Sequence, residues 1–200
     1  MARGRADGAE TRERILAAAL PLFADHGFDG ASVRDIAGAA GVNVATIAWH
    51  FKDKQGLYET LVRVLYDRLG ELRANPEDFE GDPIEAIIRR AWRFMVANER
   101  YVRLLHRHLL DQGEHTHIAM SQANDGHMLR ADELFAVLWP DRPKRDHRLM
   151  VFTVLHLLVR LSLESPAQFS KLYATDEDRE QVVVRWVTEL VRSVLGVRAP

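Results

Sequence analysis

The chain has 200 residues, of which 47% are apolar, only seven are proline and none is cysteine. This composition excludes an intrinsically disordered chain, and the lack of cysteine excludes disulfides, thiolate catalysis and cysteine-ligated metal sites. The formal net charge of −2 indicates no general affinity for nucleic acids, so a DNA-binding role would have to come from the positions of the charges.

The first residues, MARGRADGAETRER, contain no apolar core of a signal peptide. Farther along, no uninterrupted apolar stretch approaches the ~20 residues that a membrane span requires. We therefore expect a cytoplasmic protein without a membrane partner.

Apolar residues recur at helical spacing along the whole chain and predict an all-α fold. The first helix is expected to end at Gly27, with a kink or a loosened last turn at Pro21. Its apolar side consists of Ile15, Leu16, Ala19, Leu20 and Phe23.

Two short helices are expected next. The segment SVRD has the form of a capping box, in which Ser32 accepts from the N3 amide and Asp35 reaches back, and its helix runs to Ala40. Gly41 then turns the chain, and Asn43 caps a third helix that ends at about His50. The inward residues of this third helix are expected to be Val42, Ile47 and Phe51.

A fourth helix, capped by Asp53, is expected to end before Asn75-Pro76. The acidic, turn-rich segment 74–83 is the best domain boundary, and Asp82-Pro83 opens the next helix as N-cap and N1. Further helices are expected at about 101–109, 116–138 and 149–163, and a final one capped by Thr175 or Asp176. The predicted domains are residues 1–53, with a helix-turn-helix at about 32–50, a connecting helix 54–75, and a helical domain 76–200.

The short third helix has the features of a DNA-recognition helix. A second helix, a tight turn at Gly41 and a short third helix are the geometry of a helix-turn-helix, whose second element enters the major groove. Short side chains at the start of that helix suit base edges, and aromatic or basic residues beyond them suit the phosphate backbone. The alternatives are that Trp49 is a core aromatic, that His50 is an ordinary surface histidine, and that Lys54 only faces solvent.

The run from Thr11 to about Leu61 contains GFDGASVRDIA, then AGV, then WHFKDK followed by LY. This pattern resembles the N-terminal domain of the tetracycline-repressor (TetR) family of transcriptional regulators. The resemblance implies an all-helical homodimer, with a C-terminal domain that binds a small molecule and dimerises through its last two helices. It covers about a quarter of the chain.

The resemblance also implies roles for particular residues. Phosphate or backbone contacts fall on Ser32, Thr46, Trp49, His50 and Lys54, a base or phosphate contact falls on Arg34, and base reading falls on Asn43, Val44 and Ala45. The sequence departs from the commonest family pattern at Val44 and Ala48. Two base readouts remain open, a bidentate Asn-adenine pair and apolar contact with a thymine methyl group.

The second domain offers weaker signals. Its last two helices are apolar on more than one side, which favours a subunit interface over the core of a monomer. A pocket for a hydrophobic or aromatic small molecule is expected from Trp92, Met95, Val96, Leu105, His108, Met128, Phe135, Phe152 and His156, although each of these could be core. His156 and Arg160 share a helix face, where they could hold an anion, meet a partner's carboxylate or pack beside Glu164.

Histidines between 106 and 127 raise an alternative function, a helical enzyme or a metal- or cofactor-binding protein. Their spacing of two residues places the rings on different helix faces, so we expect no metal and no cofactor. The chain lacks a nucleophile elbow, a glycine-rich phosphate loop and an HExxH motif, so we expect no enzyme. The favoured function is a ligand-responsive homodimeric regulator, a repressor on a palindromic operator in double-stranded DNA. An architectural DNA-binding protein without ligand control is a third possibility.

Overall fold

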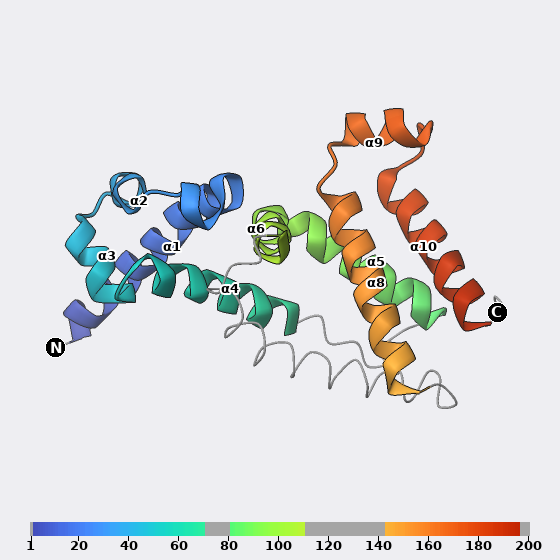
Figure 1. Cartoon of the computed structure of the whole chain (residues 1–200), viewed down its shortest axis with the longest axis horizontal. Coiled ribbons are helices and arrows are strands. Elements are labelled where there is room, and N and C mark those ends of the chain that lie inside the picture. Colours follow the sequence, from blue (N-terminus) through green and yellow to red (C-terminus); the bar gives the residue numbers. More distant parts are fainter. Residues whose placement is uncertain (1, 71–80, 111–142, 197–200) are drawn as a thin grey trace. The chain divides into compact units, whose positions relative to one another are not determined.

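The computed structural model describes residues 2–70, 81–110 and 143–196, and these residues form α-helices without any β-strand (Figure 1). The predicted all-α fold class is confirmed for this part of the chain. Two compact units are present, one comprising Met1–Leu69 and Arg100–Ala123, the other Gly70–Glu99 and Asn124–Pro200. The expected helix 116–138 and most of the expected boundary 74–83 lie outside the described residues.

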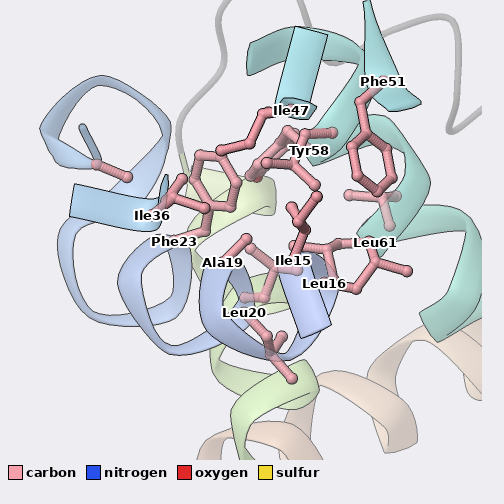
Figure 2. Close-up of a cluster of buried hydrophobic side chains, with 14 of the residues drawn as sticks. Ile15, Leu16, Ala19, Leu20, Phe23, Ile36, Ile47, Phe51, Tyr58 and Leu61 are labelled. Atoms are coloured by element: carbon pink, nitrogen blue, oxygen red, sulfur yellow. The ribbon is translucent and has the colours of Figure 1, made fainter. Parts of the chain in front are cut away.

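The first unit is built from α1 (Ala2–Gly30), α2 (Val33–Ala40), α3 (Val44–Phe51), α4 (Lys54–Gly70) and α6 (Glu99–Leu110). Its apolar core draws on every one of these helices, and Figure 2 shows the side chains that α1 to α4 contribute. Leu57, Tyr58 and Leu61 of α4 are buried in this core. Because of this packing, α4 is part of the first unit, whereas the sequence-based division placed residues 54–75 in a separate connecting helix.

An aromatic cluster ties α1 to α4. The ring centroid of Phe23 lies 5.1 Å from that of Tyr58 in an edge-on arrangement and 6.2 Å from that of Phe28, which is stacked on it. The backbone of α1 leaves helical dihedral angles at Gly27, whose φ of 72° is positive as predicted but whose ψ of −178° lies outside the left-handed helical conformation. Helical structure nevertheless resumes up to Gly30, and the residue with non-helical dihedral angles in α1 is Gly27, whereas Pro21 lies inside the helix.

The described part of the second unit contains α5 (Pro83–Ala97), α8 (Lys144–Ser162), α9 (Pro166–Tyr173) and α10 (Arg179–Leu195). Asp82 caps α5 through the amides of Ile84 and Glu85, with Pro83 in its first turn, as predicted. The N-cap of α10 is Asp178, so the predicted cap at Thr175 or Asp176 is wrong. Helix α9 has no counterpart among the expected helices.

Helices α5 and α10 run antiparallel and share a core. Asp82, at the start of α5, pairs with Arg192 near the end of α10, while Arg89 and Arg93 pair with Glu180 at the start of α10. Between these ends Ile88, Trp92, Leu158, Val184 and Val187 are buried together. Hydrogen bonds from Arg93 and then from Arg89 hold the pKa of the Glu180 carboxyl below its ordinary value.

No described helix is by itself long and apolar enough to cross a membrane. Only α8 and α9 taken as a pair, bent by 111° at their junction, reach that length and composition.

Candidate nucleic-acid interface

The turn between α2 and α3 is set by two local features that the sequence predicted. Gly41 adopts the left-handed conformation with φ 65°, and its amide donates back to the end of α2. Asn43 has extended dihedral angles and caps α3. Glycine adopts the left-handed conformation with little strain, so the chain changes direction within three residues and α3 begins at Val44.

The inner side of α3 is anchored in the core of the first unit. Ile47 is 1% exposed and Phe51 is buried (Figure 2). Val42 is partly buried against the same core. The guanidinium of Arg12 lies 5.2 Å from the centroid of the Phe51 ring. All three predicted inward residues of α3 are confirmed. This anchoring determines which side of the short helix faces solvent.

The outer side of α3 carries Val44, Ala45, Ala48 and Trp49, all of which are exposed. Trp49 is 77% exposed, so the interpretation of Trp49 as a core aromatic is wrong. Its ring lies 4.5 Å, centroid to centroid, from the half-buried ring of His50 in an edge-on arrangement. A large apolar ring held this far into water is available for contact with another molecule.

The polar side chains at the two helix starts are engaged locally. The Asn43 Oδ1 atom accepts from the Thr46 amide at 2.8 Å and from the Thr46 hydroxyl at 2.9 Å. Ser32 Oγ accepts from the amide of Arg34 at 3.2 Å, which is the N2 position of α2. The expected capping box required an N3 bond at Asp35, so its predicted geometry is wrong in this respect. The Arg34 residue is exposed.

Two lysines lie in the turn that follows α3. Lys52 is exposed and has φ 73°, an unusual value for a residue with a side chain. Lys54, the first residue of α4, donates from its ammonium to the backbone oxygen of Asp29 at 3.3 Å. Asp53 accepts from the amide of Gly56 at 2.8 Å, which confirms it as the cap of α4. The turn thus joins α3, α4 and the end of α1.

The residues expected to bind a ligand are distributed unevenly. Trp92 and Met95 are buried and Val96, Phe152 and His156 are exposed in the second unit, whereas Leu105 belongs to the first unit and is half buried. Trp92 packs in the core of α5, α8 and α10, and the guanidinium of Arg179 lies 5.0 Å from its ring centroid. Met128, Phe135 and the side chain of His108 lie outside the described residues.

The sequence also raised a metal- or cofactor-binding function based on histidines, and the described residues include only some of these histidines. His156 bonds through Nδ1 to the backbone oxygen of Phe152 at 2.7 Å, and Arg160 pairs with Glu164 at 2.8 Å. The pairing with Glu164 was one of the alternatives that the sequence left open for this face. Within the described residues, no group of three His, Cys, Asp or Glu side chains is placed to hold a metal ion. Histidines 115, 117 and 127 lie outside them.

A short helix anchored on one side, exposed on the other and following a second helix after a tight turn is the arrangement of helix-turn-helix DNA-binding domains. Comparison with known proteins agrees. Residues 15–61 match the family described as bacterial regulatory proteins, tetR family. This match confirms the resemblance that the sequence predicted for the N-terminal part of the chain.

Similar proteins add detail. The chain is 40% identical over 79 residues to the HTH-type transcriptional regulator AcrR of Shigella flexneri, covering 39% of this chain and 37% of AcrR. It is 28% identical over 94 residues to the negative transcriptional regulator IcaR of the Staphylococcus aureus biofilm operon, covering 46% of this chain and 50% of IcaR. The matches therefore span half or less of these relatives' length.

Solved structures resemble the fold over more of the chain. The crystal structure of AibR in complex with isovaleryl coenzyme A and operator DNA aligns with a TM-score of 0.68 and 19% identity, covering 90% of this chain and 97% of that one. At this level of identity the similarity concerns the fold. It confirms the expected class, an N-terminal helix-turn-helix unit followed by a helical unit.

Proposed function

We propose that the chain is a DNA-binding transcriptional regulator that places α3 in the major groove of double-stranded DNA. The observation that carries this proposal is the exposed surface of α3, which consists of Val44, Ala45, Ala48 and Trp49, while Ile47 and Phe51 anchor the helix in the core. A helix that met no partner would gain nothing from exposing a tryptophan in the middle of such a surface.

The contacts divide by chemistry. Val44 and Ala45, which follow the cap residue Asn43 at the start of α3, would face the base edges, and the groups beyond them would face the sugar-phosphate backbone. The proposed backbone contacts are Ser32, Arg34, Trp49, His50 and Lys54. The Thr46 hydroxyl, for which the sequence predicted a phosphate contact, donates to Asn43 instead. Since phosphate contacts release counterions, binding would weaken as the salt concentration rises.

We further propose that the protein acts as a homodimer on a palindromic operator, with the last two long helices as the interface. On α10, Trp186, Leu190 and Val194 are exposed at a spacing of four residues and form an apolar stripe. On α8, Leu149 and Phe152 are also exposed. Exposed apolar side chains on both α8 and α10 favour a second copy of the chain as the partner. Such a dimer would present two recognition helices to successive turns of DNA.

The regulatory part of the proposal is a repressor released by a small molecule with a substantial apolar portion. IcaR is described as a negative regulator, and the AibR structure contains both an acyl coenzyme A and operator DNA, which supports a comparable role for the helical second unit. Such an effector must bind one arrangement of the dimer better than the other, because equal affinity for both would shift nothing. Trp92 and Met95 remain the proposed apolar contacts in this unit.

The test is a gel-shift titration with the DNA that flanks the protein's own gene, set against unrelated DNA of equal length. Wild type is expected to prefer the flanking DNA, and Trp49→Ala to bind it about tenfold more weakly, the loss expected for one contact. Lys171→Ala, at an exposed position of α9, is the matched control and is expected to bind like wild type. Equal affinity of wild type for both DNAs would overturn the proposal.

A further inference from the structure

At the start of α3, Asn43 is the polar side chain best suited to recognise a base, but its oxygen is already used within the protein. An asparagine recognises adenine by accepting from N6 with its oxygen while donating to N7 with its nitrogen. The Asn43 oxygen already accepts two hydrogen bonds, from the amide and the hydroxyl of Thr46. An amide oxygen has two lone pairs, so both are occupied. Asn43 is therefore committed to capping the helix and does not offer the paired donor and acceptor that adenine requires.

Thr46 is committed by the same arrangement. Its hydroxyl hydrogen points to the Asn43 oxygen at 2.9 Å, which leaves the hydroxyl only its acceptor lone pairs. A phosphate oxygen or a purine N7 is itself an acceptor, so Thr46 has no hydrogen to donate to either in this arrangement. The Asn43 oxygen and the Thr46 hydroxyl hydrogen are therefore both used within the first turn of α3.

The other side chains exposed at this end are hydrocarbon. Val44 is 45% exposed, and Ala45 and Ala48 are exposed beside it. Ala48 lies within one helical turn of both Val44 and Ala45, so the three side chains form one continuous surface, and Val44 is at its edge beside the buried Ile47 and Phe51. In the major groove, the apolar group among the base edges is the C5 methyl of thymine. A hydrocarbon surface at the start of a recognition helix matches that group, and it offers no donor or acceptor to the other edges.

We propose that Val44, flanked by Ala45 and Ala48, is the specificity-determining residue and that it reads thymine C5 methyl groups in the operator. This inference rests on the proposed function, because it requires α3 to enter the major groove. Asn43 then acts as a positioning residue, which holds the first turn of α3 so that Val44 faces the bases.

The experiment separates the methyl group from everything else in the base pair. Operator DNA is taken from the flanking fragment or by selection from random sequence, and each thymine in a half-site is replaced in turn by deoxyuridine, which lacks only the methyl. Dissociation constants are measured by fluorescence anisotropy. At one or two thymines, uracil is expected to weaken binding about fourfold per methyl, which is the value of burying one such carbon.

The variant Val44→Ala removes the protein side of the proposed contact, as deoxyuridine removes the DNA side. Because Val44 is exposed, the variant is expected to melt like wild type, and it should bind the thymine operator more weakly while losing most of its sensitivity to uracil. Asn43→Ser keeps a capping oxygen and removes the amide, so it should retain the same base preferences within about twofold, and 7-deazaadenine in the operator should be tolerated.

The possible failures are distinguishable. If no DNA is preferred over random sequence, the proposed function itself fails. If the operator is bound specifically but every uracil substitution is neutral, or if Val44→Ala keeps the full uracil effect, the methyl-reading inference is overturned. Specific loss of binding with Asn43→Ser and with 7-deazaadenine at one position would show instead that Asn43 reads adenine.

Discussion

The ammonium nitrogen of Lys54 lies 4.6 Å from the centroid of the Phe28 ring, so the first residue of α4 is held against the end of α1. The same nitrogen donates to the Asp29 backbone oxygen. An ammonium carries three hydrogens, so one is used within the protein and others can still reach a phosphate. Lys54 therefore combines a structural contact with the phosphate contact that the family resemblance implies.

Lys54→Ala is expected to change two measurements together. Loss of the contacts with Phe28 and Asp29 should lower the free energy of unfolding by about 1 kcal/mol, seen as a lower melting temperature in circular dichroism. Loss of a phosphate contact should reduce the slope of log K against log salt concentration by about 0.9. A lower melting temperature with an unchanged slope would mean that Lys54 only positions α4.

Gly56→Ala is expected to open the turn between α3 and α4. A Cβ atom at Gly56 would overlap the backbone oxygen of Phe51, and a backbone atom in a packed turn has no free path away. We expect a loss of about 3 kcal/mol in the free energy of unfolding, at the upper end of the usual cost of overpacking, measured by urea denaturation. Gly38→Ala in α2, where nothing lies within 4 Å of the added carbon, is the control and should be neutral or slightly stabilising. Equal stability of the two variants would contradict this account of the turn.

Trp186→Glu tests the proposed dimer. A charge in the middle of the apolar stripe of α10 would be buried without a partner, and loss of an aromatic anchor costs about 2 kcal/mol or more at each of two symmetric positions. Analytical ultracentrifugation should show a shift from dimer to monomer, accompanied by weaker operator binding. Leu172→Glu introduces the same charge at an exposed apolar position of α9 and should leave the dimer intact. A wild-type chain that sediments as a monomer at micromolar concentration would remove the basis for this prediction.

Glu180→Gln tests the ion pairs between α5 and α10. Bonds from Arg93 and Arg89 lower the pKa of Glu180 from its ordinary value of 4.5. A carboxyl with a lowered folded-state pKa stabilises the fold above its ordinary pKa, and this contribution disappears as the pH falls through the folded-state value. The variant should therefore be less stable than wild type at neutral pH by about 1 kcal/mol or less, and the difference should vanish in acid below pH 4.5. The control is Glu177→Gln, which breaks the exposed pair with Arg185. If this variant lost as much stability at neutral pH as Glu180→Gln, with the same dependence on pH, the effect could not be assigned to the Glu180 ion pairs.

Several features of the molecule follow from the sequence by itself. The caps at Asn43, Asp53 and Asp82, the left-handed turn at Gly41 and the buried positions Ile47 and Phe51 were all predicted and are present. Each depends on residues no more than four positions away, because capping bonds and helical periodicity are local interactions. The long, ordered motif around them was sufficient to indicate the family.

Only the tertiary structure showed which charged side chains contact partners far away in the sequence. The contact of Lys54 with the end of α1 joins residues 25 or more positions apart, and the pairs that link Arg89 and Arg93 to Glu180 join residues 91 and 87 positions apart. Local pattern carries no information about such pairs, because they depend on the path of the chain between their members. The two hydrogen bonds that the Asn43 oxygen accepts from Thr46 are local in sequence, yet the sequence did not predict that both would form. An asparagine at this position can cap a helix or read a base, and the orientation of the Thr46 side chain determines whether its hydroxyl occupies the second lone pair.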